Sequence, residues 1–212
     1  MNILIVVAHP DDETIGMGGT IKKLAKNNTI SLCVMSDGAS AQYCDKKMIK
    51  IRQESCRKAG KILGISYYHF LDFPDMRLDT ISHLEINKEL EKIVKKINPK
   101  ILYSTGYNDL NKDHQKVFES CSVISRPISS SIKQFFCFEI GGRNLTPFSP
   151  NTYVDISNEL KFKIKALKEY KSEINTFPHP RSIKFIESLS HVRGGESGFK
   201  NAEAFELIKN YY

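Results

Sequence analysis

One short segment gathers side chains that could do chemistry. Residues 8–13 have the sequence AHPDDE, which places the imidazole of His9 and the carboxylates of Asp11, Asp12 and Glu13 directly after an apolar run. Packing needs none of these groups, and adjacent carboxylates repel one another unless a cation or hydrogen-bond donors offset them. Imidazole with carboxylate is a common ligand pairing of catalytic zinc, so the segment predicts a metal site. A helix N-cap role for Asp11 or Asp12 would explain only one of the carboxylates.

A catalytic zinc usually has three protein ligands and one open position, so a third ligand should come from another loop. The segment TGYNDLNKDHQKVF supplies His114, with Asp113 beside it, close to a predicted helix start. The other histidines lie in an apolar strand, at a helix start or in the distal part of the chain: His69, His83, His179 and His191. His114 is therefore the best third ligand, although a lone histidine in a first helical turn is equally compatible with a surface position.

The elements that must position these residues follow an alternating pattern. Short runs rich in apolar residues predict buried strands over Met1–Ala8, Ile30–Met35, Ser66–Leu71, Lys100–Ser104 and Phe135–Phe138. Segments of helical period lie between them, so the order is βαβα. We expect an α/β fold, a Rossmann-like and mostly parallel sheet with helices on both faces. Ligand sites of such sheets lie at the carboxyl ends of the strands, where His9 and His114 fall.

The remainder of the chain predicts one domain over residues 1–212. Residues 141–150 form a loop, 152–156 a strand, and the segments around 158–172, 182–192 and 201–209 helices. No linker or repeat divides the chain. The glycines at 16, 18 and 19 do not form GxGxxG, so they indicate close helix packing rather than a dinucleotide site.

Composition excludes several classes of protein. With 212 residues, 41% hydrophobic and 26% charged, the chain is neither disordered, collagen-like nor a coiled coil, and its longest apolar run is too short to span a membrane. The net charge of +7 comes from dispersed lysines, which predicts no nucleic-acid partner. The N-terminus lacks the features of a secretory signal, so we expect a cytoplasmic protein. Five scattered cysteines without a CxxC pair argue against a disulfide framework and a thiolate zinc site.

The motifs together resemble a known family. AHPDDE followed by GxGG, IRQESCRKAGKILGI, FPDMRLDT, NDLNKDH, RGG and AEAF occur in the order found in the PIG-L/LmbE family of zinc-dependent N-acetylglucosamine deacetylases. The resemblance spans nearly the whole chain. It implies that His9, Asp12 and His114 hold the metal, zinc or alternatively iron(II), and that Asp11 is the general base.

One position departs from the family pattern. Many members have a histidine three residues before the last ligand, with a role in stabilising the oxyanion, and this chain has Asn111 there. An asparagine amide donates a hydrogen bond but delivers no proton. Either Asn111 performs a reduced catalytic role or another group supplies the charge, and an N-cap role for Asn111 is an equal alternative.

The resemblance also implies where a sugar would bind. The family uses the loop that holds Arg77 and Asp79 for this purpose, although an exposed ion pair is the alternative for these two residues. The loop that begins at Asp37 should help to choose the aglycone. Arg52 and Glu54 are two residues apart on a helix and do not face each other, so we interpret them as structural or as supports of the site.

These observations favour hydrolytic removal of acetate from an N-acetylated amino sugar or its conjugate, a small-molecule substrate, with no membrane partner. The alternatives are a hydrolase of another small acylated molecule and a sugar-binding module of the same fold without activity. A phosphoacceptor receiver domain also carries an acidic pair after its first strand, but it has no role for His9 and His114. The identity of the sugar and the oligomeric state, a homo-oligomer included, stay open.

Overall fold

The computed structural model describes residues 1–43, 47–142 and 144–212. Its elements in chain order are β1 (Asn2–Val7), α1 (Asp12–Leu24), β2 (Thr29–Ser36), α2 (Lys47–Leu63), β3 (Tyr67–Phe73), the 3-10 turn η1 (Leu78–Thr80), α3 (His83–Ile97), β4 (Ile101–Thr105), α4 (Lys112–Ile124), β5 (Gln134–Phe138), β6 (Thr152–Asp155), α5 (Leu160–Leu167), α6 (Ile183–Ser197) and β7 (Ala202–Asn210).

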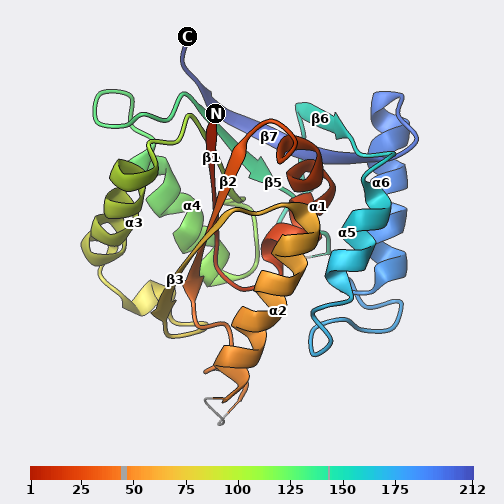
Figure 1. The fold of residues 1–212 in the computed structure, drawn as a ribbon, viewed down its shortest axis with the longest axis horizontal. Helices are drawn as coiled ribbons and strands as arrows, with labels where there is room; N and C mark the ends of the chain where they lie inside the picture. The colour runs from red at the N-terminus through yellow and green to blue at the C-terminus, as the bar shows by residue number, and fades with distance from the viewer. Residues whose placement is uncertain (44–46, 143) are drawn as a thin grey trace.

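All seven strands belong to one sheet with the order β3-β2-β1-β4-β5-β7-β6. The first five strands are parallel to one another, and β7 is antiparallel to both β5 and β6. Helices α3 and α4 cover one face, and α1, α2 and α5 cover the other (Figure 1). The predicted α/β fold is confirmed, with β1 at the centre of the parallel part.

Each face of the sheet has its own apolar core. Alternate side chains of β1, such as Ile3 and Ile5 on one face and Leu4 and Val6 on the other, belong to the two cores in turn. A central parallel strand covered on both faces is apolar throughout, which explains the continuous apolar run at the N-terminus. The loop after β1 therefore starts from a fully fixed strand.

Two sequence predictions about strands and helices are wrong. Residues 201–209 were expected to be helical but form β7, because this segment pairs with β5 on one side and β6 on the other. Its Ala, Glu, Leu and Lys residues favour helix locally, and long-range pairing overrides that preference. Strand β3 is not buried, since it lies at the sheet edge with Tyr67 60% exposed.

The glycines near the start of α1 allow close packing, as predicted. A Cβ at Gly16 would overlap the Phe138 ring, and a Cβ at Gly19 would lie 2.8 Å from Ile156. The helix is kinked between them, because Met17 has φ −142° and ψ 25°. After the kink, the backbone N–H groups of Gly19 and Thr20 donate to the carboxylate of Glu203 on β7, at 2.9 and 2.6 Å.

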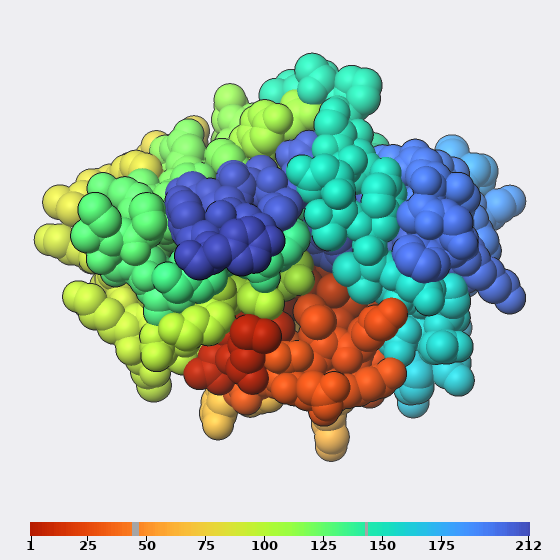
Figure 2. Space-filling model, turned by 90° about the horizontal axis from the view of Figure 1, so that it is seen from above, coloured from red at the N-terminus to blue at the C-terminus, as the bar shows by residue number. Residues whose placement is uncertain are grey.

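The two ends of the parallel sheet differ in what they carry. The first and last residues of the described chain lie on the face shown in Figure 2, at the amino ends of the parallel strands. The loops with the predicted site residues leave the opposite, carboxyl ends. No helix in the described ranges is both long and apolar enough to cross a membrane. Four cysteines, Cys33, Cys56, Cys121 and Cys137, are buried and free, and Cys44 lies outside the described residues.

Candidate metal centre

The loop between β1 and α1 is held in an unusual backbone conformation. Asp11 has φ 122°, a region that residues with a side chain rarely adopt. Its carbonyl accepts hydrogen bonds from the backbone N–H groups of Thr14 and Ile15, which begins the helix. The backbone N–H of His9 donates to Asp12 Oδ2 at 2.8 Å. The turn thereby points the side chains of Asp11 and Asp12 inward, where both are buried.

Three predicted ligands meet at one point. His9 Nδ1 lies 3.2 Å from His114 Nε2 and 3.4 Å from Asp12 Oδ2, and the last two atoms are 3.3 Å apart. In a tetrahedral site with metal–ligand bonds of about 2.0 to 2.1 Å, two ligand atoms are about 3.3 Å apart. The other oxygen, Asp12 Oδ1, is buried without a hydrogen-bond partner among the described residues. This triangle of donor atoms fits one divalent metal ion.

Carboxylates contact the ring nitrogen of each histidine that lies outside the triangle of donor atoms. Asp109 Oδ2 lies 2.7 Å from His114 Nδ1, while Asp75 Oδ1 and Asp113 Oδ2 lie 3.1 and 3.3 Å from His9 Nε2. A carboxylate that accepts a proton from the outer ring nitrogen leaves the inner nitrogen free to bind a metal. These three aspartates therefore favour the ligand tautomer of each ring.

Asp75, Asp113 and His9 form a second group whose atoms are close enough to hold a metal ion. However, both oxygens of Asp113 already accept backbone hydrogen bonds, Oδ2 from Met76 at 2.8 Å and Oδ1 from Leu78 at 3.0 Å. These bonds tie the loop after β3 to the start of α4. Asp12 has one oxygen without a hydrogen-bond partner among the described residues, whereas both oxygens of Asp113 have partners. The geometry therefore favours the triad of His9, Asp12 and His114.

Negative charge surrounds the two imidazoles. Burial by itself lowers the pKa of His9, but its hydrogen bonds with Asp113, Asp12 and Asp75 outweigh burial and raise the pKa well above its usual value. For Asp12, burial alone would raise the pKa, and the charge and hydrogen bond of His114 bring it well below the ordinary range. The centre thus favours a positive charge among its carboxylates, either protons on the rings or a cation.

Asp11 is the predicted base and lies beside the triad. Neither carboxylate oxygen has a hydrogen-bond partner among the described residues. Its Oδ2 is 3.5 Å from Arg181 Nη1 and 3.9 Å from Arg52 Nη2. Burial raises the pKa of Asp11, the charges of Arg181 and Arg52 oppose this, and Asp12 adds to it. A carboxylate with both oxygens free and a raised pKa is suited to accept a proton.

Glu13 stabilises the loop between β1 and α1 through hydrogen bonds. Its Oε1 accepts hydrogen bonds from Thr14 Oγ1 at 2.5 Å and from the Tyr170 hydroxyl at 2.6 Å, and its Oε2 accepts one from the Asp11 backbone N–H at 3.2 Å. Burial raises the pKa of Glu13 to about 7. All its partners hold the loop, so the structure gives Glu13 a supporting position.

A cavity of about 180 Å³ opens beside the triad. Its lining residues come from five loops and from α2: His9, Gln42, Arg52, Asp75, Met76, Asn111 and Arg181. A cavity of this kind, with a few convergent polar groups, is where a small ligand would bind. The predicted ligand His9 thus contacts a space that a substrate could enter.

Asn111 is both an N-cap and a cavity residue. Its Oδ1 accepts a hydrogen bond from the Asp113 backbone N–H at 2.8 Å, which caps α4. Its Nδ2 lies 3.5 Å from Met76 Sδ, so this donor has only a weak acceptor. The N-cap interpretation is therefore confirmed, and a ligand oxygen could replace the weak sulfur acceptor of the amide.

The other predicted sugar-binding residues do not line this cavity. Arg77 and Asp79 are exposed on the loop around η1. Asp37 is buried, and its Oδ1 accepts hydrogen bonds from the backbone of Ala39 and Ser40. Substrate contacts by these three residues stay predictions. Arg52, interpreted as a support, donates to the carbonyl oxygens of Gly38 and Pro10 and so joins two of the loops. Glu54 pairs with Lys58 on the surface.

Sequence reasoning missed several residues of the site. Asp75 and Asp109 follow β3 and β4, so their positions after strands were a usable signal. Arg181 and Glu173 come from the distal third of the chain, and no local pattern marks them. Nη1 of Arg181 lies 2.7 Å from Glu173 Oε2, and Nη2 of Arg52 lies 3.4 Å from the same oxygen. The two guanidinium groups and the carboxylates of Glu173 and Asp11 form one charge cluster.

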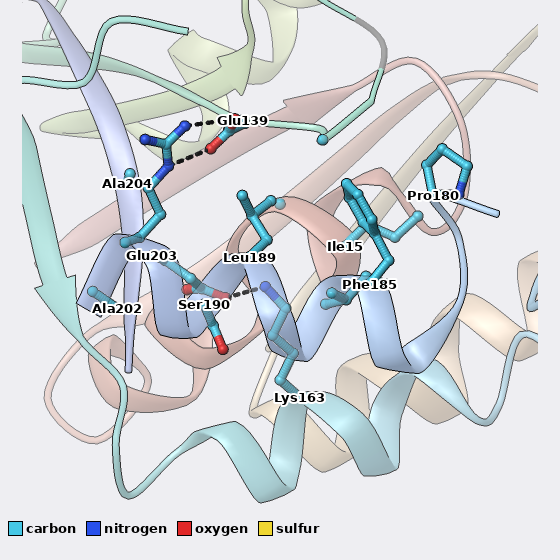
Figure 3. A pocket seen from close by; sticks show the side chains of 14 residues that line it. Ile15, Glu139, Lys163, Pro180, Phe185, Leu189, Ser190, Ala202, Glu203 and Ala204 are labelled. Carbon is cyan, nitrogen blue, oxygen red and sulfur yellow. Dashed lines mark hydrogen bonds and ion pairs between the residues drawn. The ribbon is translucent and has the colours of Figure 1, made fainter. Parts of the chain in front are cut away.

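A second cavity lies between α1, α6 and β7 (Figure 3). At about 20 Å³ it has room for little more than one water molecule. It contains a buried ion pair, Lys163 Nζ to Glu203 Oε1 at 2.6 Å, and a partly buried one, Arg193 to Glu139 at 2.8 Å. Because Glu203 also accepts the backbone bonds of α1, this region supports the kinked helix and has no room for a substrate.

The fold and the triad define an α/β protein with a candidate mononuclear metal centre at the carboxyl ends of β1 and β4. The chain belongs to the PIG-L family, described as GlcNAc-PI de-N-acetylase, whose sequence profile matches residues 4–124.

Two curated relatives and one solved structure resemble most of the chain. An uncharacterized deacetylase, YaiS, of Escherichia coli is 32% identical over 180 residues, which are 80% of this chain and 90% of that protein. Diacetylchitobiose deacetylase of Thermococcus kodakarensis is 24% identical and covers 99% of this chain and 84% of its own length. The structure of N,N'-diacetylchitobiose deacetylase from Pyrococcus horikoshii has a TM-score of 0.80 at 24% identity, covering 98% of this chain and 84% of that one, and it shares the fold.

Proposed function

We propose that this protein is a metal-dependent deacetylase that hydrolyses the amide bond of an N-acetylated amino sugar or its conjugate. The carrying observation is the carboxylate of Asp11, which is buried, free of hydrogen bonds and adjacent to the triangle of His9, Asp12 and His114. Membership of the PIG-L family and the names of the deacetylase relatives support the reaction class.

The residues divide the chemistry among them. His9, Asp12 and His114 would hold the metal, and their two nitrogens and one oxygen suit zinc or iron(II). When bound, such a metal polarises the acyl carbonyl and lowers the pKa of water. Asp11 takes a proton from the attacking water as the carbon–oxygen bond forms, and returns it to the amine nitrogen as the carbon–nitrogen bond breaks. The products are acetate and a free amine.

The cavity orients the substrate against these groups. Asn111 lines the cavity, and its Nδ2 donates to the weak acceptor Met76 Sδ at 3.5 Å, so the amide can donate instead to the acyl oxygen. Asp75 also lines the cavity and offers a charged hydrogen-bond acceptor for sugar hydroxyls. An oxyanion donor contributes most when negative charge develops on the oxygen, so Asn111 should affect turnover more than binding.

Acetate release tests the proposal. The protein is loaded with zinc or with iron(II) and incubated with N-acetylglucosamine, its β-linked dimer, sugar nucleotides and N-acetylglucosaminides. We expect metal-dependent turnover on at least one compound. Asp11→Asn should retain the metal and lose about 100-fold or more in turnover, because it removes the base and keeps the shape. Binding of these compounds without any acetate release would instead support a sugar-binding module.

A further inference from the structure

Arg181 is the cation of the cavity that the sequence did not reveal. It precedes the N-cap of α6, and its side chain is 14% exposed and lines the cavity together with His9 and Asn111. Its Nη1 contacts Glu173 at 2.7 Å and lies 3.5 Å from Asp11 Oδ2. The guanidinium therefore stands next to the carboxylate that would activate water.

Most of the donor capacity of Arg181 is unused. A guanidinium has five N–H donors, and the contacts with Glu173 and Asp11 both use Nη1. Its Nε is buried without a partner among the described residues. A buried donor without a partner is unfavourable, and an oxygen atom of a ligand in the cavity would remove that penalty.

Arg52, the other guanidinium of the cavity, is differently placed. Its Nη1 donates to the Gly38 carbonyl and its Nη2 to the Pro10 carbonyl, and the side chain is only 4% exposed. These bonds hold the loops after β1 and β2 together. The Nε of Arg52, like that of Arg181, is buried without a partner among the described residues. The two residues differ at the end of the side chain, because backbone carbonyls occupy both Nη atoms of Arg52, whereas the contacts of Arg181 with Glu173 and Asp11 use only Nη1.

The site also lacks a charged donor at the position of Asn111. Asn111 is neutral, and its carbonyl oxygen is already used to cap α4. Negative charge that develops on the acyl oxygen is stabilised more strongly by an ionised donor than by a neutral amide. Of the two guanidinium groups that line the cavity near Asp11, that of Arg181 is the one whose Nη atoms do not donate to the carbonyls of Gly38 and Pro10.

We propose, on the basis of the deacetylase function above, that Arg181 is a catalytic residue that donates a charged hydrogen bond to the acyl oxygen as the tetrahedral carbon forms. The guanidinium keeps its protons throughout, and the electron pair of the carbonyl bond moves onto the oxygen that it stabilises. Glu173 is a positioning residue, because its ion pair fixes the guanidinium at the cavity wall.

The test compares two arginines that have the same exposure and that each pair with a glutamate. Arg193 is also 14% exposed and pairs with the partly buried Glu139 and with Glu196, but it lies at the second cavity. Steady-state kinetics, metal content and thermal stability are measured for Arg181→Gln and Arg193→Gln on the best substrate. We expect Arg181→Gln to lose about 100-fold or more in kcat with KM within about threefold. Arg193→Gln should lose thermal stability and keep kcat.

Two further measurements distinguish charge stabilisation from a structural role. Guanidinium ion added to Arg181→Ala should restore part of kcat, and it should not affect Arg193→Ala. An N-trifluoroacetyl substrate stabilises its own oxyanion, so the loss caused by Arg181→Gln should be smaller on it than on the N-acetyl substrate. Arg181→Lys retains the charge and the pair with Glu173, and its kcat should lie between those of Arg181→Gln and the parent.

The outcomes separate this inference from the function on which it rests. A parent protein without turnover on any substrate overturns the proposed function and this inference with it. An active parent with Arg181→Gln within threefold of its kcat overturns the role of Arg181 alone. The role of Arg181 is also overturned if Arg181→Gln loses the same factor in kcat on the N-acetyl and the N-trifluoroacetyl substrate and if guanidinium ion restores no kcat to Arg181→Ala. If Arg181→Gln does not fold, the Arg181→Lys variant decides. Because lysine keeps the charge, a folded Arg181→Lys protein of parental stability whose kcat is below that of Arg181→Ala overturns the role of Arg181.

Discussion

Replacing Asp109 by asparagine should weaken metal binding through the tautomer of His114. Asp109 uses both oxygens: Oδ2 lies 2.7 Å from His114 Nδ1, and Oδ1 accepts a hydrogen bond from the Asn111 backbone N–H at 2.8 Å. Asparagine has one acceptor oxygen and one NH2 group. If the oxygen keeps the backbone bond, the NH2 group faces Nδ1 and makes that nitrogen an acceptor. The ring proton then moves to Nε2, the nitrogen that belongs to the triad.

The expected magnitude follows from this geometry. Removing a carboxylate behind a ligating histidine lowers metal affinity about 10- to 100-fold. Because Asp109→Asn favours the wrong tautomer as well as losing the charge, the effect should be near 100-fold, which is about 2.8 kcal/mol. Asp109 and His114 are both buried, so solvent screening does not reduce the interaction.

Competition with a chelator of known affinity measures the change directly. Asp72→Asn is the matched control, since Asp72 is exposed and its carboxylate contacts only Gln53 among the described residues. This control should bind the metal as the parent does. Parental affinity in a folded Asp109→Asn protein would refute the reasoning, because the hydrogen bond to His114 would then have no influence on the ligand nitrogen.

Three other results are expected. His9→Ala and His114→Ala should each lose bound metal in elemental analysis, and unchanged stoichiometry in both would show that the ion lies elsewhere. Asn111→Ala should lose about 1 kcal/mol of the free energy of unfolding, because it removes a helix cap. Asn111→Asp should keep the stability and lose turnover, because its carboxylate repels the oxyanion. Equal turnover in the parent and the aspartate variant would contradict a contact between residue 111 and the acyl oxygen. The metal-free protein holds the pKa values of His9 and His114 above their usual range, so protons compete with the metal, and chelator titrations should show affinity falling as the pH is lowered through those pKa values, with no trend if the rings do not ligate.

The sequence predicted which candidate ligands come together better than it predicted the residues that support them. The structure brings His9, Asp12 and His114 together. Their meeting could be expected because strands mark where loops start, and the carboxyl ends of parallel strands lie at one edge of the sheet. The supports escaped because they depend on long-range packing. No sequence neighbour of Arg181 identifies it as a site residue, and its partner Asp11 is 170 positions away in the chain. Arg181 was missed because its contacts are distant along the chain.

The error at β7 has the same physical origin. Residues 202–210 contain helix-favouring residues, and only the free edges of β5 and β6 make a strand the better solution there. Asn111 shows a different limit, since its two roles use different atoms of one amide. The sequence offered the N-cap and the oxyanion donor as alternatives, and the geometry allows both.

The support of α1 by Glu203 affects the order in which the protein can mature. Gly19 and Glu203 are 184 residues apart, and Tyr170 and Arg181 from the same distal region hold Glu13 and Asp11. During synthesis the ribosome delivers AHPDDE well before the residues that support it. The nascent chain therefore presents ligands without the packing that fixes them, and the centre becomes complete only when β7 enters the sheet. Metal loading should accordingly follow the synthesis of β7, and a chain truncated before β7 should fail to mature.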